Sequence, residues 1–267
     1  MDILTFLLLL VAGCAAGFLA GFFGVGGGIL LVPVLLFYYQ TSHVTSLIST
    51  HLAFGTSLLI IIFASGASAY RYDRGQYVIW PAVLLMGAGS AVGALIGSWL
   101  AAMLQGHTLR QIFAAILVFA SLRLVSQPRK PKGNLPPELG ARRLVPTGAL
   151  IGLVSSLAGI GGGVFAIPAM YSFFRFPLKK ALGTSSAIIT ITAFAGTIGY
   201  AVKGWNVQGL PPFALGYVDY LSALPLILGS LPLAMVGATV AEKTRADTLR
   251  KIFAVLLIVV AAKLFLG

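Results

Sequence analysis

The chain has 267 residues, of which 58% are hydrophobic and 9% charged, and its mean hydropathy is +0.99. Soluble domains contain about a quarter charged residues, so this composition excludes an ordinary soluble protein and indicates one that crosses a membrane several times. The net charge of +12 does not imply a nucleic-acid partner, because Lys and Arg clustered beside apolar spans act as topology signals.

The N-terminus, MDILTFLLLLVAGCAAG, resembles the apolar region of a signal peptide, but it has no basic start, and we expect it to be retained. The first apolar stretch, 3–38, continues from it into GFFGVGGGILLVPVL, with three consecutive glycines. Each costs about 1 kcal/mol relative to Ala inside a helix, so the helix must break there. In a membrane such a break is tolerated only where it is buried in protein or lines a cavity.

Cys14 lies in the same stretch. As the lone cysteine of the chain it excludes an intrachain disulfide and offers no metal-ligand spacing. We therefore expect neither a metal nor a cofactor.

Six further apolar stretches are long enough to cross a bilayer, for which about 20 residues are needed. They are 43–70, 77–104, 108–126, 178–202, 219–241 and 246–266. An eighth stretch, 144–174, carries a second glycine break in SLAGIGGGVFAIPAM.

The two glycine segments belong to an internal duplication. At an offset of 135 residues, seven positions between 13 and 37 are identical in the two halves, including all three consecutive glycines and Pro33 with Pro168. At an offset of 140, TLRQIFAAILVFASLR matches TLRKIFAVLLIVVAAK at seven of 16 positions. The chain thus divides into an N-terminal repeat (1–126), a Pro-rich basic linker (127–143) and a C-terminal repeat (144–267).

The basic residues distinguish two topologies. If each glycine segment crosses once, giving eight crossings, the 18 Lys and Arg divide ten to eight between the two sides. If each is a hairpin that turns at its glycines, fifteen lie on one side and three, Arg110, Lys203 and Lys263, on the other. The positive-inside rule favours the hairpins, although 3–22 alone is long enough to span. The predicted fold is all-α and polytopic, with two inverted repeats, each a glycine-broken helical hairpin plus three spanning helices.

The doubled GxGGGxxxxP motif, GVGGGILLVP and GIGGGVFAIP, followed by STHLAF in one half and GTSSAI in the other, resembles the TauE/SafE family of membrane transporters. The resemblance covers nearly the whole chain. It implies transport of a small sulfur-containing anion such as sulfite, sulfoacetate or a related sulfonate.

The glycines are the first candidate binding residues. Unpaired N–H groups at a helix start, with the positive end of the helix dipole behind them, bind oxyanions without a charged side chain. The alternative is close helix packing through small residues. The candidates are Gly26, Gly27, Gly28, Gly161, Gly162 and Gly163.

Hydroxyl groups at the start of the next element in each half form the second candidate set. At the offset of 135, Ser49, Thr50 and His51 match Thr184, Ser185 and Ser186. Hydroxyls can donate to oxyanion oxygens, or bond to their own helix carbonyls instead. His51 is the only titratable residue well inside a predicted span, and a protonated imidazole would suit an anion, whereas a neutral one would bond to a nearby carbonyl.

Two further features bear on the substrate. Arg110 and Arg250 repeat at helix starts, where snorkelling to the interface competes with attraction of anions to the pathway. The six acidic residues fall near predicted ends or in loops, whereas transport of cations would need a buried carboxylate. Their placement favours an anion.

Together these features predict a non-enzymatic exporter of a small sulfur-containing anion, embedded in the lipid bilayer of a bacterial plasma (inner) membrane and working by alternating access around a midplane site. An anion channel and a permease for an unrelated carboxylate remain alternatives. No nucleic acid is expected as a partner, and a homodimer is left open.

Overall fold

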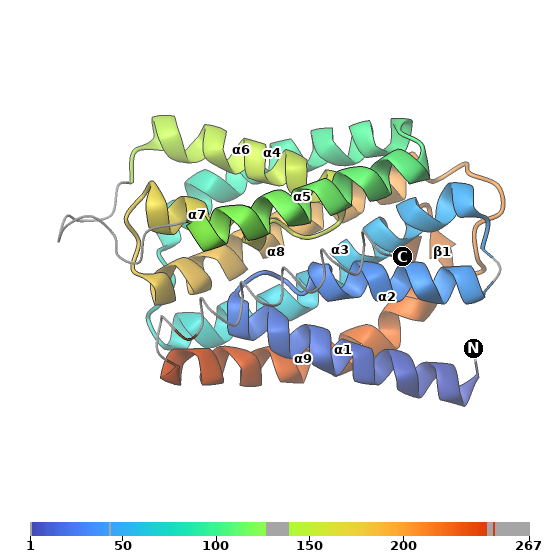
Figure 1. Ribbon diagram of the computed structural model, residues 1–267, viewed down its shortest axis with the longest axis horizontal. Coiled ribbons are helices and arrows are strands. Elements are labelled where there is room, and N and C mark those ends of the chain that lie inside the picture. The colour runs from blue at the N-terminus through green and yellow to red at the C-terminus, as the bar shows by residue number, and fades with distance from the viewer. Residues whose placement is uncertain (1, 43, 127–138, 245–247, 249–267) are drawn as a thin grey trace.

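The computed structural model describes residues 2–42, 44–126, 139–244 and 248. These residues form nine helices and one two-stranded antiparallel sheet (Figure 1). The helices are α1 (Ile3–Phe23), α2 (Gly28–Thr41), α3 (Ser46–Arg74), α4 (Trp80–Met103), α5 (Gly106–Ser126), α6 (Ala141–Ala158), α7 (Gly163–Ser172), α8 (Leu178–Lys203) and α9 (Tyr220–Lys243). The strands β1 (Ala214–Leu215) and β2 (Val218–Asp219) lie between α8 and α9.

Five of the described helices, α1, α3, α4, α8 and α9, are long and apolar enough to cross a membrane. Two others, α2 and α7, are apolar but have only 14 and 10 residues, short of the 20 or so that a span needs. The predicted all-α polytopic membrane fold is confirmed. The predicted last span, 246–266, and most of the linker fall outside the described residues.

The helices break where the glycines predicted. Helix α1 ends at Gly24 and α6 ends at Gly159, with φ of 62° and 64°. Left-handed residues of this kind stop a helix, and glycine adopts the conformation without a steric penalty. The next helices, α2 and α7, begin at Gly28 and Gly163.

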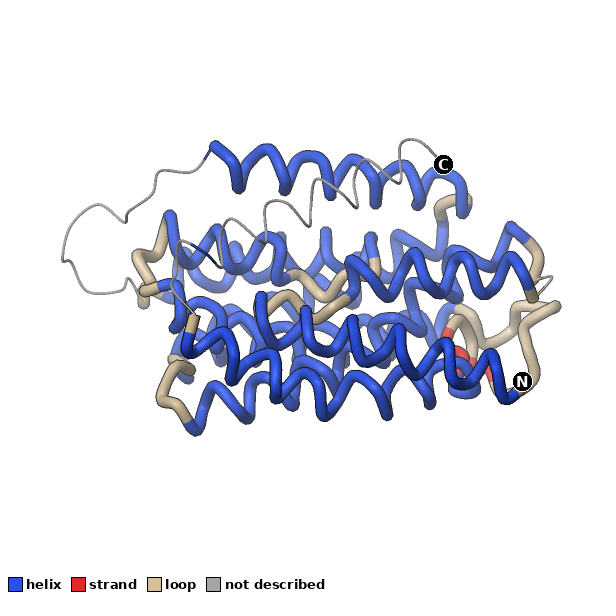
Figure 2. Tube along the Cα trace, turned by 60° about the horizontal axis from the view of Figure 1, so that its bottom comes forward, coloured by secondary structure: helices blue, strands red, loops and turns tan. Residues whose placement is uncertain are grey.

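Each glycine segment turns back toward the end of the bundle from which it came (Figure 1). Gly13 of α1 packs against Leu226, near the start of α9, and Tyr39, at the end of α2, bonds to Ser222 in the same region. Thus α1 begins and α2 finishes at one end. By the same kind of contact, α6 begins and α7 finishes at the opposite end, beside the start of α4. Figure 2 shows both loops as tan segments in the middle of the bundle.

Two pairs of helices pack so closely that their backbones touch. A Cβ added to Gly13, Gly17 or Gly21 of α1 would lie 2.5, 2.2 or 1.9 Å from a carbonyl oxygen of α9. Helices α4 and α6 approach in the same way, through Gly89, Gly93 and Gly97 on one side and Gly148 and Gly152 on the other. Small residues permit this approach within a membrane, and each pair joins helices from different halves of the sequence.

The centre of the bundle is formed by α3 and α8. In the most apolar part of each helix, 72% of the residues are buried in α3 and 78% in α8, against 28% in α1. The described basic residues gather at one end of this bundle. Nine of them lie at or near the ends of α3, α5, α7 and α9 and the starts of α6 and α8, and two, Arg110 and Lys203, lie at the other end. The asymmetry agrees with the charge count that favoured hairpins.

Candidate substrate site between the glycine loops

Both glycine loops expose backbone N–H groups in the interior of the protein. Gly26 and Gly27 have φ of 82° and 80°, and Gly161 and Gly162 have φ of 85° and 96°. Among the described residues, no acceptor is found for the N–H groups of Gly26 to Gly28 or of Gly161 to Gly163. All six glycines are buried. Buried donors without a protein acceptor need a ligand or an internal water, and an anion is a ligand that would satisfy them.

The two loops lie against each other at mid-depth. A Cβ on Gly28 would touch the backbone of Ile160 at 2.7 Å, and one on Gly163 would touch the backbone of Val25 at 2.4 Å. The starts of α2 and α7 therefore face the opposing loop, and their dipoles present two partial positive charges to one region. The methyl groups of Ile61 and Ile189, near the middles of α3 and α8, each approach both Gly26 and Gly161.

Unpartnered hydroxyls line the loops. The Oγ atoms of Ser65 and Ser155 are buried and have no hydrogen-bond partner; each residue is 1% exposed. Ser65 Oγ lies 3.3 Å from the Cβ position of Gly26, and Ser155 Oγ lies 2.9 Å from that of Gly162. An unsatisfied buried hydroxyl costs about 1–3 kcal/mol. Both donors are therefore available to a ligand at the loops.

Two other serines hold the loops in place. Ser57 Oγ on α3 donates to Gly159 O at 2.7 Å, and Ser185 Oγ on α8 donates to Gly24 O. One turn earlier in each loop segment, Tyr72 OH donates to Gly21 O and Tyr200 OH donates to Ser156 O, at 2.8 and 2.9 Å. Each long helix thus contacts both hairpins: its serine holds the hairpin of the other half, and its tyrosine holds the hairpin of its own half.

These contacts correct the predicted alignment of α3 in the first half with α8 in the second half. Ser57 corresponds to Ser185 and Tyr72 to Tyr200, both at an offset of 128 residues. The predicted pairing of Ser49, Thr50 and His51 with Thr184, Ser185 and Ser186 at 135 is therefore wrong. The signal in the sequence was Gly-Thr-Ser, present at 55–57 and again at 183–185.

The predicted polar residues consequently divide between different places. Ser185 reaches a glycine loop, while Thr184 Oγ1 accepts from Ile79 N and Ser186 Oγ bonds to its own helix at Leu182 O. Ser49 and Thr50 accept hydrogen bonds from Arg110 of α5, at 3.2 and 2.9 Å. The structure does not place Ser49 and Thr50 against the glycines.

His51 lies close to one end of the bundle. Its Nε2 is 3.1 Å from both Ala101 O and Leu104 O at the end of α4, and its ring stacks on Tyr217 with centroids 4.9 Å apart. An imidazole N–H that donates to the last carbonyls of a helix stabilises that terminus. This geometry matches the neutral, carbonyl-bonded alternative, and no contact links His51 to the glycines.

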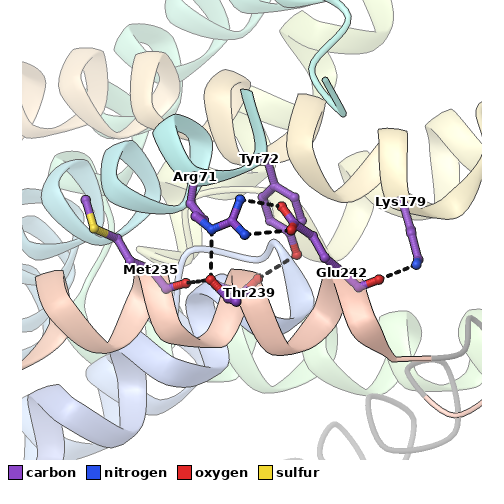
Figure 3. Close-up of polar contacts among 7 residues, drawn as sticks. Arg71, Tyr72, Lys179, Met235, Thr239 and Glu242 are labelled. Atoms are coloured by element: carbon purple, nitrogen blue, oxygen red, sulfur yellow. Dashed lines mark hydrogen bonds and ion pairs between the residues drawn. The ribbon is translucent and has the colours of Figure 1, made fainter. Parts of the chain in front are cut away.

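The opposite, basic end is held by an ion pair. Arg71 of α3 pairs with Glu242 of α9 at 2.9 Å and donates to Thr239, while Lys179 of α8 donates to Glu242 O (Figure 3). The side chains of Arg71 and Glu242 are 30% and 13% exposed. The cluster ties together the ends of three helices.

One acidic residue lies deeper than its place in the sequence predicts. Asp219 is expected near an end or in a loop and outside the interior, but it is only 3% exposed. Its Oδ1 accepts from Leu221 N and caps α9, and its Oδ2 accepts from Tyr39 OH. The prediction that no carboxylate is buried is therefore wrong.

Known proteins resemble this chain along nearly its whole length. A family model described as "Sulfite exporter TauE/SafE" matches residues 9–264. The chain belongs to the sulfite exporter TauE/SafE family. A protein of Haemophilus influenzae named "Probable membrane transporter protein" is 32% identical, covering 98% of this chain and 99% of that relative. No solved structure shows a significant match.

Other members of the TauE/SafE family share the same general description. The Bacillus subtilis protein "Probable membrane transporter protein YunE" is 27% identical over 98% of this chain and 97% of its own length, and a Methanocaldococcus jannaschii relative of similar name is 26% identical over 91% and 89%. With the apolar helices, these likenesses establish an integral membrane transporter of the TauE/SafE type.

Proposed function

We propose that the protein exports a small sulfur-containing anion, such as sulfite or an organosulfonate, across the bacterial plasma membrane. The observation that carries the proposal is the meeting of two helix starts at mid-depth, with unpaired N–H groups and the free hydroxyls of Ser65 and Ser155. Fixed dipoles and neutral donors favour an anion and leave it free to dissociate, since no opposite charge binds it. The sulfur comes from the family's name alone.

The proposed site lies between inverted repeats. The paired contacts of Ser57 with Gly159 and Ser185 with Gly24 support this symmetry, as do hairpins that start from opposite ends. In such transporters alternating access arises when one set of helices rocks against another around a central site. Ile61 and Ile189, which touch both loops, would separate as either side opens.

The moving sets are not the two halves of the sequence. Helix α1 packs backbone to backbone on α9, and α4 packs likewise on α6. Moving one half as a block would pull both pairs apart. We therefore assign α1, α2 and α9 to one unit and α4, α6 and α7 to the other, with α3 and α8 meeting between them.

Transport in proteoliposomes tests the proposal. Purified protein should take up labelled sulfite with saturation and show counterflow, in which unlabelled sulfite inside the vesicle drives uptake of label. A channel would give flux without counterflow, and vesicles that carry acetate but not sulfite would favour the carboxylate alternative. The absence of any anion flux would overturn the proposal.

Variants of the free hydroxyls locate the site. Loss of a hydrogen bond to a charged ligand costs about 1.5–3 kcal/mol, so Ser65→Ala and Ser155→Ala should each weaken sulfite affinity about ten- to a hundredfold. Ser68→Ala is the matched control, because Ser68 Oγ is buried but bonds to Ala64 O of its own helix. Equal sulfite affinity in all three variants would show that sulfite does not bind at Ser65 and Ser155.

A further inference from the structure

Asp219 is a buried carboxylate without a cationic partner. It is 3% exposed, its Oδ1 lies 3.0 Å from Leu221 N and its Oδ2 lies 3.2 Å from Tyr39 OH. Within the described part of the chain no Lys, Arg or His forms an ion pair with it. Burying a charge without such a partner is costly, so a residue of this kind needs an explanation.

Tyr39 OH is the centre of the network around this carboxylate. It lies 3.2 Å from Asp219 Oδ2, 3.2 Å from Thr56 Oγ1 and 2.9 Å from Ser222 Oγ. A phenol can donate one hydrogen bond and accept two, so donation to Asp219 and acceptance from the two hydroxyls satisfies the group. The three hydroxyls thus have partners within the network, and among the described residues Asp219 belongs to no cluster of acidic, His or Cys side chains of the kind that holds a metal ion.

The same position in the other half is apolar. There, Ile79 N donates to Thr184 Oγ1 at 3.0 Å, as Asp219 N donates to Thr56 Oγ1 at 2.9 Å. The residues that correspond to Asp219, Ser222 and Tyr39, at the repeat offsets of 140 and 135, are Ile79, Ala82 and Phe174. The architecture is thus built at one end without any acid or phenol. At the other end Asp219 Oδ1 also caps α9, but the bond between the threonine and the backbone N–H forms without an acid or a phenol.

The network around Asp219 includes Thr56, which is next in sequence to the serine that holds a glycine loop. Thr56 contacts both Asp219 N and Tyr39 OH, and the next residue on α3, Ser57, donates to Gly159 O. A proton on Asp219 Oδ2 would make that oxygen a donor, and Tyr39 would then accept from it and donate to Thr56 or Ser222. The rearrangement would reach the turn of α3 that holds the loop.

We propose that the Asp219 carboxyl binds the proton that couples anion transport to the proton gradient. The inference rests on the proposed anion transport. Proton uptake from the aqueous phase at this end forms an O–H bond on Oδ2 and takes the carboxylate from −1 to neutral; release reverses both. The site is therefore charged in one state and neutral in the other, which suits a step that alternates between two arrangements.

Other ionisable groups lie near this end. On the elements packed around Asp219 they are Tyr38 and Tyr39 of α2, His51 of α3, Tyr200 and Lys203 of α8, Tyr217 just before β2, Tyr220 at the start of α9, and Arg110 of α5. Lys203 lies over the Trp99 ring at 5.0 Å and Arg110 bonds to Ser49 and Thr50. Neither base faces the carboxylate.

Paired flux measurements test the inference. Proteoliposomes with a pH-sensitive dye inside should show proton movement with sulfite flux, and an imposed pH gradient should drive sulfite accumulation. In Asp219→Asn we expect counterflow to continue while gradient-driven accumulation falls to the level without a gradient. Protons moved by sulfite's own buffering are the same in both proteins, so the comparison removes them. Asp73→Asn is the control, since Asp73 is an acid that bonds to Trp80 at the opposite end.

The outcomes separate the two proposals. If the wild type carries no anion, the proposed function is wrong, and so is this inference, which rests on it. If the wild type carries sulfite but a pH gradient does not drive it, if a Na⁺ gradient drives it instead, or if Asp219→Asn remains proton-driven, only the inference is overturned. Should Asp219→Asn not fold, Tyr39→Phe keeps the acid and removes its hydroxyl partner; it should shift the pH profile of driven flux, and an unchanged profile would overturn the assignment.

Discussion

The two Gly-Thr-Ser segments, 55–57 on α3 and 183–185 on α8, occupy equivalent places at opposite ends of the bundle. Their serines make equivalent contacts. Each donates to the carbonyl at the end of the first helix of the hairpin in the other half of the sequence. Their threonines accept from equivalent backbone N–H groups, those of Asp219 and Ile79. Only the residues around the threonines differ.

This difference separates what the fold needs from what it does not. A hydroxyl at each serine and threonine satisfies backbone groups that would otherwise be buried without partners. The acid, phenol and extra hydroxyl occur at one end only. Variants that alter one segment and then the other can therefore distinguish structural effects, which should be equal, from functional effects, which should not.

The largest effects are expected in the loops that the two segments hold. Gly27→Ala places a Cβ 2.7 Å from Ala16 O at a φ of 80°. The left-handed conformation costs about 1–2 kcal/mol, and overpacking against a backbone carbonyl costs about a further 1–3 kcal/mol. Gly162→Ala meets the side chain of Ser155 instead, which can rotate. Thermal unfolding in detergent should show Gly27→Ala as the less stable variant, and sulfite flux should fall in both. Equal stability of the two variants would mean that the α1 backbone at Ala16 moves to accommodate the added methyl group.

Removing the serine hydroxyls should give the next largest effect. Ser57→Ala and Ser185→Ala each leave a buried carbonyl with one partner fewer, at a cost of about 1–3 kcal/mol. Both serines reach the carbonyl that ends a hairpin arm, so the losses of stability on chemical or thermal unfolding should be similar, with the smaller loss for Ser57→Ala because Ser57 Oγ shares its hydrogen with Phe54 O at 2.8 Å. A much larger loss for one variant would contradict the register assigned to the two segments.

The threonines should separate stability from function. Thr56→Val and Thr184→Val each deprive one backbone N–H of its acceptor, at about 1 kcal/mol, so their unfolding transitions should be similar. Sulfite flux measured against external pH should change in Thr56→Val, which also loses contact with Tyr39, and not in Thr184→Val. Identical pH profiles would show that the Asp219 network is structural.

The smallest effect is expected at His51. A Gln side chain retains a donor for the carbonyls of Ala101 and Leu104, so His51→Gln should cost less than about one hydrogen bond, 0.5–1.5 kcal/mol. The pH dependence of flux should remain that of the wild type. If the dependence disappeared while the protein stayed folded, titration of His51 would replace Asp219 as its origin.

Much of the fold could be predicted from the sequence, because glycine and apolar runs act locally. The breaks at Gly26 to Gly28 and Gly161 to Gly163 were predicted in this way, whereas the hairpins were predicted from the distribution of Lys and Arg along the chain. The register of α3 against α8 was not, since α2 has 14 residues and α7 has 10; an offset that aligns the glycines no longer aligns the long helices after them. Asp219 was misjudged because its burial arises from α2 and α3, which are distant in sequence.

The contact between α1 and α9 also bears on how the protein is made. Gly13, Gly17 and Gly21 lie against residues roughly 200 positions later in the chain. At ribosomal speeds of about 5–20 residues per second, the first helix is synthesised about 10–40 s before its partner. During that interval its glycine face has no α9 to cover it. The newly made N-terminal segment must therefore be held, by lipid or by the insertion machinery, until the final third of the polypeptide has entered the membrane.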